Sequence, residues 1–454
     1  MNAPQIAVLL LVGAGCSAPR PRAVPAALPP PVRPMVDEES AAPRRGLLPV
    51  PTNYDDRAIH LAGDWGGTRS KLASDGLQVD GVLTQVGQDV TRGGRRRGFE
   101  YGLKFETSWK LDLDRSGTVP GGLLTMRTES RGGSSVNRSA GVVLPVADAL
   151  FFPLTDEVDE ELPIAVTELR YTQFLSKSLG LFLGKFTTLG GDANEFAGGR
   201  GDTQFMSHGF LSASVTALIN PYSTVGGGVI WMHSDDLVVT SSIYAADDSS
   251  TTAGLDTLDD GLIWSSSVRT QHEWGGLPGG MMLTGQYGFD NEFVDFRGRF
   301  VSQDGFRIPL ERDTWNVFWN LWQYLEVEPG SDERIDVLDG RTDREGLGFF
   351  ARAAVADRDT NPIRAAFSGG LAGRGLFFDR EHDTAGVGYV YSDVQAAPLA
   401  TGTLLDTAAQ RAELYYTFQF GAATELTLDL QWADSLLGTV DEATVLGFRV
   451  RTQF

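Results

Sequence analysis

The chain has 454 residues, a formal net charge of −21 at pH 7 and 54 glycines. Such a negative charge disfavours binding to nucleic acid, because phosphate backbones are recognised mainly through lysine and arginine. The glycine content argues against a helix-rich enzyme, since each glycine in a helix interior costs about 0.8–1 kcal/mol relative to alanine. The single cysteine, Cys16, excludes a disulfide framework and a cysteine-based metal site.

The first apolar run, from Ile6 to Val12, is too short to cross a membrane as a helix, which takes about 20 residues. It suits the core of a signal peptide, although no basic residue precedes it. We therefore expect residues 1–16 to be a signal peptide. Gly13-Ala14-Gly15-Cys16 leaves two alternatives open: a lipoprotein-type site with Cys16 lipidated, or an ordinary cleavage site among small residues.

Two further segments precede the main part of the chain. Residues 17–53 are rich in proline, alanine and arginine and include Pro29-Pro30-Pro31. Because such a composition cannot bury a core, it predicts an extended linker. Residues 54–76 are predicted to be a periplasmic segment with a short helix that starts near Asp64. Residues 77–454 are expected to form a single domain.

From residue 77 onward the sequence alternates with period 2, which is typical of strands with two different faces. In the segment from Phe99 to Leu113, most odd positions are aromatic or aliphatic, whereas the even positions include Lys104 and Glu106. The alternating segments run to roughly 10 residues or more, the length that a tilted membrane-spanning strand needs. Charged side chains within them must face water, because lipid strongly disfavours them.

About sixteen such segments fit into the chain, with an uncertainty of one or two. The sequence therefore predicts an all-β fold, a transmembrane antiparallel β-barrel of about sixteen strands that is wide enough to leave an open channel. A short periplasmic helix precedes it, and both termini lie on the periplasmic side. Phe454, an aromatic residue at the end of the last strand, is similar to the signal that the barrel-assembly machinery reads.

The same parity predicts the face of each side chain, and a register error of one residue would exchange the faces of a whole strand. Six residues are expected to face lipid: Leu103, Phe105, Trp109, Leu428, Leu430 and Phe448. Four are expected to face the lumen: Lys104, Glu106, Asp429 and Arg449. Trp322 and Tyr324 have two possible roles, in an aromatic girdle at the membrane interface or in the lumen.

Four groups of residues resemble motifs of the OprB-type carbohydrate-selective porin family, in that family's order. They are Gly63-Asp64-Trp65-Gly66-Gly67-Thr68-Arg69; Gly184-Lys185-Phe186 with Asp192, Asn194, Glu195, Phe196 and Ala197; Phe349-Phe350-Ala351-Arg352 with Ser368-Gly369-Gly370-Leu371 and Gly375-Leu376; and Glu413, Tyr415 and Tyr416 with Leu430-Gln431 and Gly447-Phe448-Arg449. The resemblance covers residues 61–454. It implies a channel for small sugars in the cell outer membrane, surrounded by lipid, as a monomer or homotrimer and without a cofactor. Trp432-Ala433-Asp434-Ser435 departs from the family pattern, which leaves the identity of the sugar open.

Charged residues with inward parity or within a family motif are the candidate pore-lining residues. They are Lys104, Glu106, Arg127, Glu129, Arg131, Glu168, Arg170, Lys185, Asp192, Glu195 and Arg352. Arg127, Glu129 and Arg131 alternate in sign on one face of one strand, which favours a mixed-charge constriction that holds sugar hydroxyls. A generic wet wall of paired charges explains the same pattern. In both cases passage requires weak binding, so that the solute can leave.

Three other functions are weighed against a sugar channel. An enzyme is disfavoured, because no Gly-x-Ser-x-Gly or His-Glu-x-x-His motif occurs among the few histidines. His208, near Ser207 and Ser212, is the best candidate base, and a carboxylate or carboxamide partner would be the discriminating observation. The remaining alternatives are a barrel that tethers the envelope through residues 17–53 and a general or ion-selective porin of the same fold.

Two acidic stretches, Asp156 to Glu161 and Asp247 to Asp260, are predicted to be loops. Solvated loop charge is the simpler interpretation of both. Cation bridging to lipopolysaccharide or Ca²⁺ binding is the alternative. We predict no metal site and no catalytic residue.

Overall fold

The computed structural model describes residues 46–49, 60–142, 144–151, 164–190, 192–255, 258–296, 301–302, 305–306, 309–331, 344–394, 407–421, 423–435 and 438–454. The predicted signal peptide, most of the predicted linker and the acidic stretch from Asp156 to Glu161 lie outside these residues. The chain divides into two units, Met1–Arg33 and Pro34–Phe454, and everything described below belongs to the second. Among the helices described, none is long and apolar enough to cross a membrane.

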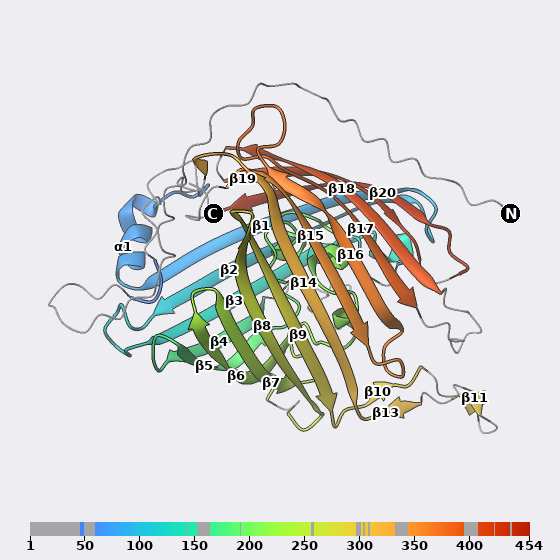
Figure 1. Cartoon of the computed structure of the whole chain (residues 1–454), viewed down its shortest axis with the longest axis horizontal. Helices are drawn as coiled ribbons and strands as arrows, with labels where there is room; N and C mark the ends of the chain where they lie inside the picture. The colour runs from blue at the N-terminus through green and yellow to red at the C-terminus, as the bar shows by residue number, and fades with distance from the viewer. Residues whose placement is uncertain are drawn as a thin grey trace. The chain divides into compact units, whose positions relative to one another are not determined.

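Sixteen strands of the described residues close into one barrel, and each strand is antiparallel to its neighbours. Strand β1 pairs with both β2 and β20, so the last strand closes on the first (Figure 1). The strands are β1 (Leu77–Arg92), β2 (Gly98–Asp112), β3 (Gly122–Gly133), β4 (Ala165–Phe174), β5 (Leu179–Thr187), β6 (Ser223–Ser234), β7 (Leu237–Ala245), β8 (Leu262–Trp274), β9 (Leu277–Phe289), β14 (Thr314–Val327), β15 (Gly346–Ala356), β16 (Ile363–Arg374), β17 (Thr384–Val394), β18 (Ala408–Phe420), β19 (Thr424–Ala433) and β20 (Ala443–Gln453).

The predicted barrel is confirmed, and so is the predicted facing of its side chains. The outward set is exposed or partly exposed: Leu103, Phe105, Trp109, Leu428, Leu430 and Phe448. The inward set is buried or partly buried: Lys104, Glu106, Asp429 and Arg449. The alternation of the sequence is therefore in register with the two faces of these strands.

Because the strand number is even, β1 begins and β20 ends at the same end of the barrel, which we call the terminal end. Connections there include two-residue turns, at residues 235–236 and 275–276. The opposite end, which we call the loop end, carries longer connections such as residues 134–164 and 188–222. Outer-membrane barrels have short periplasmic turns and long external loops, which assigns the terminal end to the periplasm.

A short helix precedes the barrel at its terminal end, as predicted. The 3₁₀ turn η1 (Trp65–Gly67) leads into α1 (Thr68–Ser74), which lies near the start of β1 (Figure 1). The Asp64 carboxylate accepts a hydrogen bond from the Ser70 backbone N–H at 2.7 Å and so satisfies a donor in the first turn. Residues 46–49 also bind the barrel, since the Leu48 backbone N–H donates to the Asp112 carboxylate at 2.9 Å.

The connections at the loop end contain the remaining short elements. Residues 134–151 include α2 (Asn137–Ala140) and η2 (Asp148–Leu150). Residues 192–222, which we call the luminal loop, include η3 (Gly199–Gly201), α3 (His208–Leu211) and η4 (Thr216–Leu218). Four two-residue strands lie between β9 and β14: β10 (Phe293–Val294), β11 (Val301–Ser302), β12 (Gly305–Phe306) and β13 (Leu310–Glu311).

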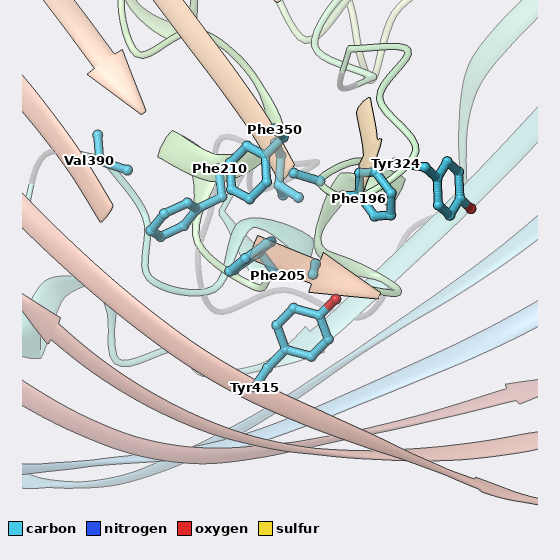
Figure 2. Packing of buried hydrophobic residues seen from close by; sticks show 10 residues of the cluster. Phe196, Phe205, Phe210, Tyr324, Phe350, Val390 and Tyr415 are labelled. Carbon is cyan, nitrogen blue, oxygen red and sulfur yellow. The ribbon is translucent and has the colours of Figure 1, made fainter. Parts of the chain in front are cut away.

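Among the described residues, the largest buried hydrophobic cluster is rich in aromatic rings and lies inside the barrel, between the luminal loop and the wall. Phe205 of the luminal loop stacks on Phe210 with ring centroids 4.7 Å apart and meets Tyr415 of β18 edge-on at 4.8 Å. Phe196 packs in the same way against Tyr324 of β14 at 4.8 Å. Figure 2 shows these rings together with Phe350 of β15. Burial of this much aromatic surface holds the loop against strands β14 to β18.

Inward-facing glycines make room for these rings. A Cβ atom on Gly348 of β15 would lie 2.1 Å from Cζ of Phe196 and 2.7 Å from the backbone oxygen of Gln323. A Cβ atom on Gly388 of β17 would lie 2.5 Å from Cε1 of Phe210. The bare backbone at these two positions is therefore part of the surface on which the luminal loop packs.

We expect Gly348→Ala to destabilise the barrel by about 1–3 kcal/mol, because the added methyl group overpacks the contact with Phe196. Thermal unfolding in detergent, followed by the mobility of the folded barrel in gels, measures this loss. Gly285→Ala is the matched control, since a Cβ atom at Gly285 of β9 meets nothing within 4 Å. Equal stability of the two variants would contradict the packing described for the luminal loop.

Candidate solute pathway in the barrel lumen

A buried arginine of the wall binds the luminal loop at three points. Arg352 of β15 donates from Nε to the Asp192 carboxylate at 2.8 Å, from Nη1 to the Phe210 carbonyl at 2.7 Å and from Nη2 to the Ala197 carbonyl at 2.6 Å. Burial raises the pKa of Asp192, although Arg352 opposes the effect. The predicted pore residues Asp192 and Arg352 thus form a buried pair, beneath the loop instead of on an open lumen surface.

The opposite wall holds the same loop through other charged residues. Lys104 of β2 pairs with Asp202 at 2.6 Å, and Arg449 of β20 donates to the carbonyls of Gly201 at 2.7 Å and Gln204 at 2.9 Å. On the side of Arg352, the neighbouring strand β14 also holds the loop, since the Asn320 amide oxygen accepts a hydrogen bond from the Asn194 side chain at 2.6 Å.

These contacts show how far the luminal loop reaches. Seven strands separate β2 from β14 on either side of the barrel: β3 to β9 on one side, and β15 to β20 with β1 on the other. The loop therefore crosses the lumen from wall to wall and narrows it.

Strand β18 anchors both inward connections. The Glu413 carboxylate accepts hydrogen bonds from the backbone N–H groups of Met206 at 2.5 Å and Ser207 at 3.0 Å. Arg411 donates to the carbonyls of Leu144 at 2.6 Å and Pro145 at 2.8 Å, in residues 134–151. Buried charges of the wall are thus satisfied by loop backbone as well as by loop side chains.

The inner faces of β2, β3 and β4 carry a network of ion pairs that we call the mixed-charge wall. Its members are Lys104, Glu106, Arg127, Glu129, Arg131, Glu168 and Arg170 from the strands, with Arg200, Asp202 and Tyr222 from the luminal loop. Nitrogen–oxygen distances in its pairs include 3.4 Å for Arg127 with Glu106 and 3.1 Å for Arg170 with Glu168. Five cations face four carboxylates, so the wall carries little net charge.

The members of the wall differ in what they can offer a solute. The Glu129 carboxylate is fully buried and already bonded to Arg131, Arg200, Tyr222 and Thr167. The side chains of Arg127 and Arg170, in contrast, remain 25% and 34% exposed. Among Arg127, Glu129 and Arg131, which were predicted to form a constriction, Arg127 is thus the most exposed and Glu129 is completely buried.

Arg200 was missed by the sequence analysis, although it completes the wall. Its guanidinium binds Glu106 at 3.1 Å and Glu129 at 2.9 Å and also contacts the Tyr222 hydroxyl. Burial alone would lower the pKa of Arg200, but Tyr222, Glu106 and Glu129 raise it well above its usual value. Its backbone is left-handed, with φ of 54°, between two glycines. The Gly-Arg-Gly sequence is the one signal that could have indicated a fixed arginine here.

The remaining predicted residues have distinct positions. Lys185 of β5 donates to the backbone carbonyls of Ser249 at 2.5 Å and Thr252 at 2.7 Å, so it anchors the connection between β7 and β8. The acidic stretch from Asp247 to Asp260 lies in that connection, which confirms the predicted loop for its described residues. Glu195 of the luminal loop accepts a hydrogen bond from the Tyr324 hydroxyl at 3.0 Å.

A cavity of about 290 Å³ lies between the luminal loop and strands β14 to β20. Its polar lining residues are Glu195, Thr203, Gln204, Arg344, Arg374, His382, Thr384, Thr417, Gln419, Glu425, Arg451 and Gln453. The aromatic rings that border it, Phe196, Tyr324 and Tyr415, are buried. Trp322 and Tyr324 take the lumen-facing alternative, because both rings contact Phe196.

His208 has the carboxylate partner that would favour an enzyme. Its Nδ1 lies 2.8 Å from Oδ1 of Asp148, and both side chains are buried between the two inward connections. The nearby Ser207 hydroxyl accepts from Arg411, and Ser212 shares a hydrogen bond with Thr216. The pair therefore links two loops. No group of three or more metal-binding side chains occurs in the part of the chain that the structure describes.

Comparison with known proteins defines the class of the molecule. A solved structure of OprB from Pseudomonas putida, determined at high pH, superposes with a TM-score of 0.71 over 87% of this chain and 98% of that chain, at 19% identity. The low-pH structure of the same protein gives 0.53 over the same shares, at 17% identity. A comparison with curated proteins returned no match.

A closed barrel of this kind, narrowed by an inward loop, is that of an outer-membrane porin. The model of the carbohydrate-selective porin, OprB family, matches residues 96–454. The chain belongs to this family and lies in the outer membrane.

Removing one buried anchor of the luminal loop should lower the stability of the folded barrel. We expect Arg352→Met to destabilise the barrel by about 3–5 kcal/mol, because Asp192 and two backbone carbonyls lose their partner. Arg364→Met is the matched control: its partly exposed pair with Asp393 should contribute at most about 1 kcal/mol. Thermal unfolding of both variants measures the difference, and similar losses would contradict the anchoring role of Arg352.

Asp202 gives a testable pH dependence. Burial alone would raise its pKa, but Lys104 and Arg200 lower it below the usual value. A carboxyl group with a lowered pKa in the folded state stabilises the fold at neutral pH. This contribution is lost as the pH falls from the unfolded value of about 3.9 through the folded value.

We therefore expect Asp202→Asn to unfold at a lower temperature than the parent at pH 7. The difference between the two unfolding temperatures should become smaller below about pH 4. Asp441→Asn, at an exposed position in a loop-end connection, is the control and should unfold at the same temperature as the parent. Thermal unfolding at pH 7, 5 and 3 tests this. If the difference in unfolding temperature between Asp202→Asn and the parent stays constant down to pH 3, the pairing of Asp202 is contradicted.

Proposed function

We propose that small neutral saccharides, from monosaccharides to short oligosaccharides, cross this porin past the mixed-charge wall and through the cavity at the luminal loop. The observation that carries the proposal is that both surfaces offer many hydrogen-bonding groups with nearly balanced charge. A neutral, hydroxyl-rich solute gains from such groups, whereas an ion gains little from a wall without net field.

Exposed members of the mixed-charge wall supply the donors and acceptors. Arg127 and Arg170 donate to sugar hydroxyls, and the partly exposed carboxylate of Glu106 accepts from them, while the buried carboxylate of Glu168 pairs with both arginines. Their ion pairs hold the four side chains in place before the sugar arrives, so that binding costs little ordering entropy. Glu129 has no exposed surface and acts by fixing Arg131 and Arg200.

The cavity adds uncharged partners. Gln453 presents an amide that both donates and accepts, and Thr203 adds a hydroxyl. The amides of Gln204 and Gln419 also line the cavity, but they already donate to backbone carbonyls. Arg451 is paired with Glu425 at 3.2 Å, so this charge is largely balanced as well. Hydrogen bonds spread over two surfaces favour weak binding at several points, which lets the solute leave.

Removal of the exposed arginine charges should weaken sugar binding. We expect Arg127→Gln combined with Arg170→Gln to raise the maltotriose concentration that half-blocks the ion current by about tenfold, since a charge-assisted hydrogen bond contributes about 1.5 kcal/mol or more. Single channels in planar bilayers provide the measurement. Arg96→Gln combined with Arg97→Gln removes equal charge at exposed positions of the loop end and should change nothing.

Other outcomes of this experiment separate the alternatives. Unchanged block in the Arg127 and Arg170 variant would contradict the role of the mixed-charge wall. A parent channel that conducts ions selectively without any sugar block would indicate a general porin. A parent barrel that inserts and conducts nothing would favour an envelope-tethering role.

We also propose that the assembly machinery recognises Phe454 during folding. Two contacts support this proposal. The Phe454 backbone N–H donates to the Gly81 carbonyl at 2.8 Å, and its ring meets Phe105 edge-on at 6.3 Å. Phe454 thus lies at the seam where β20 closes on β1.

A further inference from the structure

The segment before the barrel carries an exposed tryptophan that neither the fold nor the lumen explains. The Trp65 side chain is 43% exposed. Its backbone is left-handed, with φ of 51°, a conformation that bulky residues rarely adopt. Strain of this kind persists where the surrounding structure enforces it and is frequent at binding sites.

Contacts of the same segment place it at the terminal-end mouth of the lumen. Arg69 of α1 binds the Asp80 carboxylate of β1 at 2.6 Å. Asp80 shares the inward parity of Thr84, which contacts Asp202 of the luminal loop. On the other side, the Leu61 backbone N–H donates to the carbonyl of Gln453, a residue that lines the cavity. Two contacts thus tie the segment to β1 and β20 at the terminal end of the barrel, one of them to an inward-facing side chain of β1.

Trp65 is partly covered by one neighbouring side chain and is followed by two glycines. The buried Arg69 guanidinium lies 5.3 Å from the centroid of the indole and helps to fix its orientation. Gly66 and Gly67 follow the tryptophan, and a Cβ atom at either position would meet nothing within 4 Å. The backbone after Trp65 is therefore uncrowded, and the tryptophan itself is 43% exposed.

We propose that Trp65 is a stacking site for a pyranose ring at the terminal-end mouth, where the sugar enters or leaves the cavity. The inference rests on the proposed function. The aromatic rings that border the cavity are buried, so the cavity offers hydrogen bonds without an open aromatic face. Trp65 supplies such a face, against which the C–H side of a sugar ring packs by dispersion.

Two substitutions of similar bulk test the stacking surface itself. Trp65→Leu keeps an apolar side chain without a flat ring, whereas Trp65→Phe keeps a flat ring. Trp274→Leu is the matched control, because Trp274 is similarly exposed near a terminal-end turn but has the outward parity of Trp264 on β8. Block of the ion current by maltotriose, added to the terminal-end side of full-length channels in planar bilayers, is the readout.

We expect Trp65→Leu to raise the half-blocking concentration about fivefold, as for the loss of one aromatic contact, while Trp65→Phe and Trp274→Leu stay close to the parent. Parent-like block in Trp65→Leu overturns the inference and leaves the proposed function intact. An equal change in Trp65→Leu and Trp274→Leu also overturns it, because the effect would then come from anchoring in the membrane. If maltotriose does not block the parent channel, the proposed function itself fails.

Discussion

The constraint on which the structure depends is that charged side chains on the inner wall are buried and must be paired. Lys104, Arg352 and Arg449 would each be costly inside the barrel without partners. The luminal loop supplies those partners through its carboxylates and its backbone carbonyls. Wall and loop therefore stabilise each other, and the position of the loop across the lumen follows from the pairing.

This arrangement also accounts for two inward-facing glycines, Gly348 and Gly388. Aromatic rings of the luminal loop pack directly on bare backbone at Gly348 and Gly388, because larger residues there would exclude them. Packed aromatic side chains thus fill part of the lumen beside β14 to β18, next to the polar cavity, while β2 to β4 keep a polar, balanced surface. A channel built in this way has hydrogen-bonding capacity without a strong field, which fits a family of porins selective for carbohydrates.

Sequence reasoning predicted the barrel well because period-2 alternation is a local property. Phe105 and Lys104 are adjacent, and their opposite faces follow from strand geometry alone. It could not predict which inward charges meet water, because the covering segment comes from residues 192–222. Glu129 and Arg352 face inward as expected and yet are buried. Arg200 had no periodic signal, since it lies in a loop whose position is set by tertiary contacts.

The central claim is that the luminal loop, held by buried wall charges, sets the width of the channel. Single-channel conductance of a variant in which residues 193–214 are replaced by a short glycine-serine segment tests this claim most directly. If the account is right, channels that insert and remain folded conduct ions severalfold better than the parent and are no longer blocked by maltotriose. A conductance and sugar block equal to those of the parent would contradict it.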